Sequence, residues 1–295
     1  MNNLPQEIIC YIVNYLEDTV DVFNFSLTNK TNRKIIIDNK NAFNCTKTLN
    51  IKYINEISNL DIIGKIKVEI YDDDYIDINN IYMLNICIEL FLNRCNNVND
   101  VSMLSKIKKL KFSKCYSIND VSMLGNVEEL YIYECDNITD VSNLGKVKKL
   151  KLEYCKGIID VSNLGNVEEL DLSWCYNIKD VSMLRNVKKL NLSNCYEIKD
   201  VSNLGNVKKL NLSSCENISD VSMLGNCEEL NLSNCENISD VSCLGKVKKL
   251  NLSGCYKITD VSNLRDVEEL NLSYCYNIKD VSMLGKVKKL NLSNC

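Results

Sequence analysis

Cysteine and aspartate recur through most of this sequence at one fixed spacing, and both residue types can bind metals or take part in catalysis. Cys recurs every 20 residues from Cys95 to Cys295, and Asp recurs every 20 residues from Asp100 to Asp280. The sequence contains no histidine. This excludes Ser-His-Asp and Cys-His nucleophile pairs and every zinc site that uses His.

A cysteine repeated at a fixed interval is more typical of packing than of a metal shell. Thiols from successive repeats would form a column of neighbours instead of a tetrahedral cluster, and the sequence has no C-x-x-C pair. A buried thiol behaves as a small apolar group with a weak S–H donor. We therefore predict structural thiols, no metal site, no cofactor and no catalytic residue, so that the protein is not an enzyme.

The apolar residues indicate which elements position these side chains. The repeat over residues 181–200 has seven apolar positions, and every repeat from 81 to 280 keeps an apolar residue or Cys at all of them: Val181, Leu184, Val187, Leu190, Leu192, Cys195 and Ile198. Leu190 and Leu192 alternate with Asn191, which predicts a short strand with outward Asn and Ser side chains. Asp200 precedes the next V-S-x-L segment, where its carboxylate can cap a tight turn.

Each repeat is thus predicted to form one coil of a solenoid, with a strand, a corner, a turn on the far side and a return. One coil alone buries too little apolar surface to fold, so stability requires stacking with parallel strands about 4.8 Å apart. Residues 81–295 contain the regular coils, and residues 41–80 contain degenerate N-terminal repeats and a linker. In that ragged region, segments 49–51 and 68–70 also read as strands.

Pairs of like charge precede the first strand Leu of each coil. The order is Lys-Lys or Glu-Glu, and eight of the nine neighbouring steps from 108 to 289 place opposite charges side by side. This order predicts a ladder of cross-strand ion pairs, with a charge-reading surface as the alternative. The one like-charge step, Lys188-Lys189 beside Lys208-Lys209, is the best place for an acidic group of a ligand.

Asn-Leu-Ser triplets from Asn191 onward match glycosylation sequons, but we interpret them as an Asn ladder hydrogen-bonded from coil to coil.

The pattern over residues 49–295 resembles the leucine-rich repeat, L-x-x-L-x-L-x-x-C/N-x-x-I/L, and is most similar to short cysteine-type repeats with a D-V-S-x-L turn. The resemblance implies an α/β solenoid with short parallel strands on its concave face. It implies no role in chemistry for the repeated residues.

The N-terminal segment has no 20-residue period, and its apolar residues recur at helical spacing. It resembles an F-box through twelve residues: Leu4, Pro5, Glu7, Ile8, Ile12, Tyr15, Leu16, Asp18, Ser26, Leu27, Lys30 and Arg33. It departs from the pattern at Asn32, where an aromatic residue often stands before the Arg. The resemblance implies a small helical module over residues 1–40 that docks onto the adaptor of a cullin–RING ubiquitin ligase. The adaptor-binding residues would be Leu4, Pro5, Ile8, Ile9, Ile12 and Leu16.

Target binding is expected where the repeat departs from its own pattern. From Asn191 onward the outward strand positions are uniformly Asn and Ser, whereas earlier coils carry charged and aromatic residues. Aromatic residues dominate binding hot spots, so the expected target site is Lys111, Tyr131, Tyr133, Lys151, Glu153, Tyr154, Asp171 and Trp174. The sequence therefore predicts an F-box substrate receptor that links a target protein to a ubiquitin ligase. A free-standing repeat scaffold or inhibitor with no ligase role is the alternative.

Net charge and hydropathy limit which other partners and which cellular compartment we expect. The net charge of −4 argues against a dedicated nucleic-acid binder, and no apolar run is long enough to predict a membrane span. The first residues do not resemble a secretory signal, so we expect a cytoplasmic, reducing location. The chain stops at Cys295, inside a coil, and we expect the apolar residues of this last coil to support end-to-end self-association.

Overall fold

The computed structural model describes residues 48–49, 67–71 and 87–295, and the chain forms two compact units, Met1–Ile118 and Asn119–Cys295. The expected F-box-like module over residues 1–40, with its six adaptor-binding residues, lies outside the described residues. Most of the expected linker over residues 41–80 also lies outside them. These domain boundaries stay predictions.

The first unit contains a parallel arrangement of strands over its described residues. Its elements are β1 (Thr48–Leu49), β2 (Lys67–Ile70), β3 (Glu89–Asn93), η3 (Ser102–Leu104, a 3₁₀ helix) and β4 (Lys109–Ser113). Leu49 pairs with Val68, Val68 with Leu90, and Leu90 with Leu110. The strand expected over residues 68–70 is therefore confirmed, whereas of the strand expected over 49–51 only Leu49 lies within the described residues. Leu49, Val68 and Leu90 lie 19, 22 and 20 residues before their partners in the next strand.

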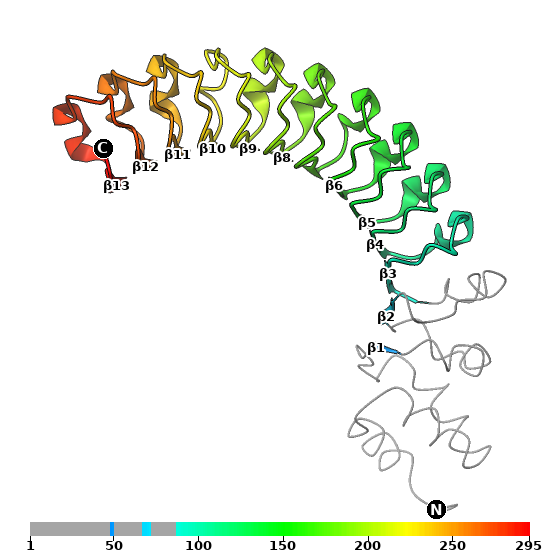
Figure 1. Cartoon of the computed structure of the whole chain (residues 1–295). Coiled ribbons are helices and arrows are strands. Elements are labelled where there is room, and N and C mark those ends of the chain that lie inside the picture. The colour runs from blue at the N-terminus through cyan, green and yellow to red at the C-terminus, as the bar shows by residue number, and fades with distance from the viewer. Residues whose placement is uncertain (1–47, 50–66, 72–86) are drawn as a thin grey trace, which may run out of the picture. The chain divides into compact units, whose positions relative to one another are not determined.

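The second unit, whose residues 119–295 are all described, repeats one strand and one outer turn per coil (Figure 1). Its strands are β5 (Glu129–Tyr133), β6 (Lys149–Glu153), β7 (Glu169–Asp171), β8 (Lys189–Asn191), β9 (Lys209–Asn211), β10 (Glu229–Asn231), β11 (Lys249–Asn251), β12 (Glu269–Asn271) and β13 (Lys289–Asn291). Its 3₁₀ helices are η4 (Ser122–Asn126), η5 (Ser142–Lys146), η6 (Ser162–Leu164), η7 (Ser182–Asn186), η8 (Ser202–Asn206), η9 (Ser242–Lys246), η10 (Ser262–Leu264) and η11 (Ser282–Lys286). The outer elements of residues 119–295 are therefore 3₁₀ helices and turns rather than the α-helices that an α/β solenoid suggests.

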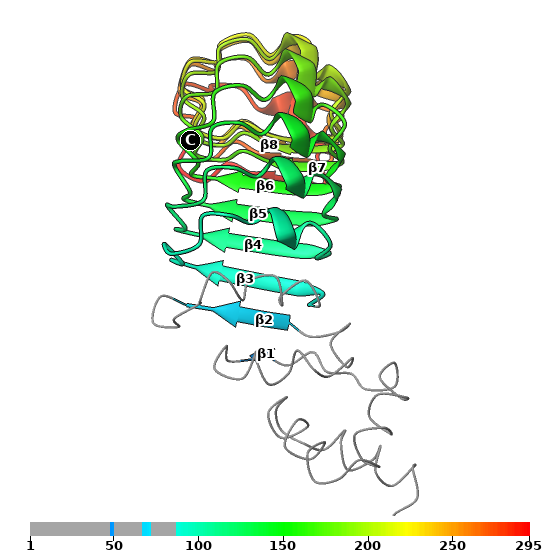
Figure 2. The ribbon, with the colours of Figure 1, turned by 90° about the vertical axis from the view of Figure 1, so that its right-hand side faces the viewer.

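Strands β5 to β13 pair in parallel, each with the next one along the chain. Figure 2 shows β5 to β8 side by side in this order. The register is constant, so that Leu130 pairs with Leu150, Leu150 with Leu170, and Leu170 with Leu190. In Figure 1 the strands lie along the inner side of this unit and the 3₁₀ helices along its outer side. The predicted solenoid is confirmed.

The core lies between the strands and the outer turns. In the coil of residues 181–200, all seven predicted apolar positions are at most 2% exposed, and the equivalent residues of the neighbouring coils are similarly buried. In the last coil, Val281 and Leu290 are each 38% exposed. The expected end-to-end self-association stays a prediction.

The recurring Asp caps the outer turn, as the sequence predicts. In ten coils its carboxylate oxygen accepts a hydrogen bond from the backbone N–H of the Ser two residues later, at 2.8–2.9 Å. The Ser202 backbone N–H and then its hydroxyl hold the pKa of Asp200 below its ordinary value, because both stabilise the charged carboxylate. The Ser162 backbone N–H and hydroxyl lower the pKa of Asp160 in the same way.

Candidate binding surface

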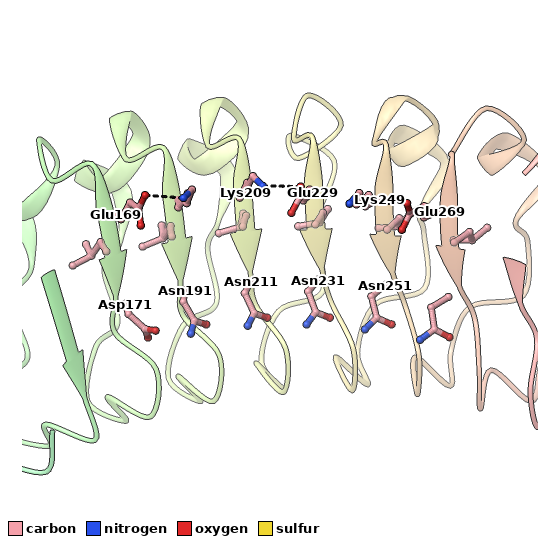
Figure 3. Close-up of a pocket in the computed structure, with 18 of the residues that line it drawn as sticks. Glu169, Asp171, Asn191, Lys209, Asn211, Glu229, Asn231, Lys249, Asn251 and Glu269 are labelled. Atoms are coloured by element: carbon pink, nitrogen blue, oxygen red, sulfur yellow. Dashed lines mark hydrogen bonds and ion pairs between the residues drawn. The ribbon is translucent and has the colours of Figure 1, made fainter. Parts of the chain in front are cut away.

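The strands of the second unit line an open groove of about 800 Å³ on their exposed face (Figure 3). Two rows of mostly polar side chains reach it from successive strands, and a row of strand Leu residues lies between them. We call the first the charged row, and it consists of Lys149, Glu169, Lys189, Lys209, Glu229, Lys249, Glu269 and Lys289. We call the second the inner row, and it consists of Tyr131, Lys151, Asp171, Asn191, Asn211, Asn231, Asn251, Asn271 and Asn291.

The charged row forms the predicted ladder of ion pairs. Lys189 Nζ lies 2.6 Å from Glu169 Oε1, Lys209 Nζ lies 2.7 Å from Glu229 Oε1, and Lys289 Nζ lies 2.9 Å from Glu269 Oε1. The Glu169 carboxylate raises the pKa of Lys189, and the Lys289 ammonium lowers the pKa of Glu269. The parallel register places these opposite charges side by side, so most Lys and Glu of the row have a structural role.

The one like-charge step of the ladder occurs between β8 and β9. Lys189 and Lys209 are register partners, and each ammonium turns toward the Glu on its other side. Within residues 119–295 no carboxylate bridges these two Lys side chains. This step is therefore a point of the groove that favours an added negative charge.

The inner row from Asp171 onward makes hydrogen bonds within each coil, which differs from the coil-to-coil Asn ladder that we expected. Asn191 Oδ1 accepts from the backbone N–H of Ser193 at 3.1 Å, and the remaining Asn of the row make the same contact with the Ser two residues later. Asp171 does the same with Ser173 at 3.0 Å. The turn draws Ser173 and Ser193 inward, where they are only 5% and 7% exposed. Ser193 was expected on the exposed face of the strand, and its burial shows that this expectation is wrong.

The residues expected to form one target site divide among several places. Tyr131, Lys151 and Asp171 line the groove, and the Lys151 ammonium lies 5.5 Å from the centre of the Tyr131 ring. Lys111 lies on β4 in the first unit, 2.8 Å from Glu89. Glu153 closes β6 and lies 3.5 Å from Lys151.

The other three predicted site residues form an aromatic stack at the ends of the strands. The Tyr133 and Tyr154 rings meet edge to face at 5.5 Å, and the Tyr154 and Trp174 rings lie parallel at 4.8 Å. Tyr176 and Tyr196, which are not among the predicted site residues, continue the stack: the Trp174 and Tyr176 rings lie 6.1 Å apart and the Tyr176 and Tyr196 rings 5.4 Å apart. We call these five residues the aromatic stack. Tyr176 and Tyr196 lie 20 residues apart, at the same position of two successive coils, and this recurrence is the signal in the sequence that points to them.

Two members of the aromatic stack occupy a backbone conformation that large side chains rarely adopt. Tyr154 and Trp174 have φ values of 58° and 63°, in the left-handed region that Gly and Asn tolerate best. The equivalent residue is Asn194 with φ 61° and Gly254 with φ 72° in later coils. Arg94, Lys114, Glu134 and Tyr274 have the same left-handed φ at the equivalent position of other coils, so this conformation belongs to the repeat and carries the two rings at the ends of their strands.

The cysteine column is structural. Sγ of Cys195 donates to the Leu172 carbonyl oxygen at 3.1 Å, and Cys215 and Cys235 bond in the same way to Leu192 and Leu212. Burial raises the pKa of Cys155, Cys215 and Cys235 to about 12, so these thiols stay neutral. Within residues 87–295 the cysteines are unbridged, and the described part of the chain holds no cluster of metal-binding side chains. No helix within these described residues is long and apolar enough to cross a membrane.

Comparisons with known proteins show likeness in structure only. No protein-family model and no curated protein matches the sequence. An internalin from Listeria monocytogenes is 22% identical over 85% of this chain and 79% of its own, with a TM-score of 0.59. A leucine-rich repeat protein of Leptospira interrogans is 17% identical over 88% of this chain and 86% of its own, with a TM-score of 0.53. The chain therefore has the leucine-rich repeat fold that its sequence pattern resembles.

Proposed function

We propose that this protein is a binding scaffold that holds another protein against the aromatic stack and the adjoining groove. The observation that carries the proposal is the stack itself, in which the Tyr154 and Trp174 rings lie parallel at 4.8 Å and stay partly exposed. Large rings bury much area at low entropic cost, which makes them effective anchors in protein interfaces. The proposed role is binding rather than catalysis.

The Trp174→Ala and Tyr133→Ala double variant tests the target site. We expect capture of target proteins from cell extract to weaken by more than about tenfold relative to the full chain, which corresponds to about 1.4 kcal/mol. The control changes Ser233 and Asn234, which occupy the equivalent positions of a later coil, and should leave capture unchanged. Equal losses in both variants would show that the aromatic stack is not the binding site.

A more specific role for the same scaffold is that of an F-box substrate receptor. In this role residues 1–40 bind the adaptor of a ubiquitin ligase through Leu4, Pro5, Ile8, Ile9, Ile12 and Leu16, in the cytoplasm. The support is the sequence resemblance of this segment to an F-box, together with the repeat fold that follows it. A free-standing scaffold or inhibitor would use the same repeats without an adaptor.

A binding assay with the full chain distinguishes these two roles. Purified adaptor should bind the full chain, and the Leu4→Ala, Pro5→Ala variant should lose that binding while its circular dichroism and melting temperature stay unchanged. Absence of adaptor binding to the unaltered chain would exclude the receptor role and leave the free-standing scaffold. Binding that survives both substitutions would show that these residues do not form the contact.

A further inference from the structure

The inner row over strands β8–β13 presents a row of amide N–H donors to the groove. Its members are Asn191, Asn211, Asn231, Asn251, Asn271 and Asn291. In each of them Oδ1 accepts from the N–H of the Ser two residues later. That N–H is a donor, so the atom facing it must be the amide oxygen, and the Nδ2 group faces away from the turn. Within residues 119–295 these six amide nitrogens donate no hydrogen bond to a protein atom.

The charges beside these donors have the matching sign. Strands β8–β13 contribute four Lys and two Glu of the charged row to the groove, an excess of two positive charges in a chain whose net charge is −4. The like-charge step at Lys189 and Lys209 lies within this stretch, next to Asn191 and Asn211. Ammonium and amide donors together favour ligands that bring negatively charged acceptors.

We infer that the groove over β8–β13 binds an extended acidic segment of a partner protein, with ligand carboxylates at the Asn amides and at the Lys189–Lys209 step. The inference rests on the proposed binding function and names the chemistry of the partner segment. The ligand carboxylates would accept hydrogen bonds from the Asn Nδ2 groups. They would also supply the negative charge that the ladder of ion pairs lacks between β8 and β9. Glu229 and Glu269 interrupt the positive row, so a peptide with spaced carboxylates fits better than the uniformly charged backbone of a nucleic acid.

Asp171 limits this donor row at β7. Its Oδ1 makes the same turn contact with Ser173 that the Asn residues make with their Ser partners, at 3.0 Å. Its second carboxylate oxygen therefore takes the place of an amide donor. At this end of the row the Asp171 carboxylate can accept hydrogen bonds from donors of a ligand, and it repels ligand carboxylates. The bound segment therefore has a preferred orientation, with its acidic part over β8–β13 and its neutral or basic part toward β7.

The chain itself shows which substitution tests the inference with little structural change. Asn211→Asp should keep the turn, because Asp171 already makes the same hydrogen bond, yet it replaces an amide donor by a carboxylate in the groove. Asn203→Asp provides the control, since Asn203 is exposed in η8 on the outer side of the same coil and the change in charge is equal. Asp171→Asn is the reverse change and should extend the donor row by one coil.

The probe is a fluorescein-labelled synthetic peptide of alternating Glu and Ser, titrated onto the full chain with fluorescence anisotropy. We expect saturable binding that Asn211→Asp weakens by about tenfold, as for loss of a hydrogen bond to a charged group, and that Asn203→Asp leaves unchanged. Asp171→Asn should tighten binding, a gain that misfolding would not produce. Circular dichroism and urea midpoints of the three variants check that each is folded.

Three results would overturn the inference: no saturable binding of the acidic peptide, equal weakening by Asn211→Asp and Asn203→Asp, or no gain from Asp171→Asn. A single-stranded oligothymidylate that binds as tightly as the peptide would replace the acidic-peptide site with a general polyanion site. Failure of the peptide while target capture still depends on Trp174 and Tyr133 would reject this inference alone. Loss of that dependence would reject the proposed function instead.

Discussion

Strand β6 and strand β7 lie side by side in the same unit, yet they differ in length and in the chemistry of their exposed face. Strand β6 runs five residues and carries Lys151 in the inner row, whereas β7 runs three residues and ends at Asp171. Every strand from β7 to β13 is equally short and ends at Asp or Asn. Strand β5, which carries Tyr131, is long like β6.

The cause of the difference is one side chain in each coil. An Asp or Asn in the inner row accepts the backbone N–H of the residue two positions later and so turns the chain. Lys and Tyr cannot accept in this way, and the strand continues. Pairing between coils is nevertheless kept, because Leu192 N–H donates to the Asn211 carbonyl oxygen at 2.8 Å and Asn194 N–H donates to Ser213 at 2.9 Å. The repeat therefore varies its exposed face without altering its core.

The largest expected effect tests whether the core is indeed common to both kinds of coil. Leu152 follows Lys151 in β6 and Leu192 follows Asn191 after β8, and both side chains are fully buried. We expect Leu152→Ala and Leu192→Ala each to lower the free energy of unfolding by about 2–5 kcal/mol, because each leaves a cavity. Urea denaturation followed by circular dichroism measures the two losses. Met183→Ala, at a side chain that is 53% exposed, serves as the control and should change stability by less than about 0.5 kcal/mol.

If the losses in free energy of unfolding for Leu152→Ala and Leu192→Ala differ by more than a factor of two, the two kinds of coil do not share one core. Such a difference would mean that the turn at Asn191 also changes the packing behind the strand. Equal losses would confine the difference between β6 and β8 to the exposed face.

The next effect tests the turn itself. Asn211→Ala removes the acceptor of the Ser213 N–H, a contact of 3.1 Å, and should lower the free energy of unfolding by about 1 kcal/mol. Asn211→Asp should restore most of that loss, because a carboxylate oxygen can accept the same N–H. Lys151→Ala makes the matched change in a long strand, where no such turn exists, and should cost less than about 0.5 kcal/mol.

Equal urea midpoints for Asn211→Ala and the unaltered chain would show that the side-chain hydrogen bond does not stabilise the short strands. Strand length would then depend on another feature of these coils.

Much of this architecture could be predicted because the period is long and repeated without a break. The spacing of Leu190, Leu192 and Cys195 is sufficient to predict the strand, its buried face and the thiol column, since the same constraint recurs in every coil. The Asp200 turn was equally predictable, because a short carboxylate before a tight turn has one usual partner, the backbone N–H two residues later.

The exposed face was less predictable, because its contacts depend on turns that begin and end within one coil. We expect from the sequence that the Asn191 side chain forms a hydrogen bond to the next coil. In the structure Asn191 Oδ1 instead accepts from the backbone N–H of Ser193, two residues later. The aromatic stack extends to Tyr176 and Tyr196 because a left-handed residue after each strand redirects the chain, and bulky residues such as Trp174 give no sequence signal for that conformation. Sequence periodicity thus predicts the core better than it predicts the neighbours of exposed rings.

The smallest expected effect concerns the outer turns, which are the same in both kinds of coil. The carboxyls of Asp160 and Asp200 have pKa values below the ordinary value of 3.8, since Ser162 and Ser202 donate to them. Their stabilising contribution is therefore fully present above the unfolded pKa and is lost as the pH falls through the lower folded pKa. The urea midpoint should be constant above about pH 5 and should fall below about pH 4. Asp160→Asn and Asp200→Asn keep an acceptor for the Ser N–H but remove the titrating group, so each should reduce the acid sensitivity slightly and to the same degree. A larger reduction in one of the two variants would show that the difference between the coils extends from the groove to the outer side.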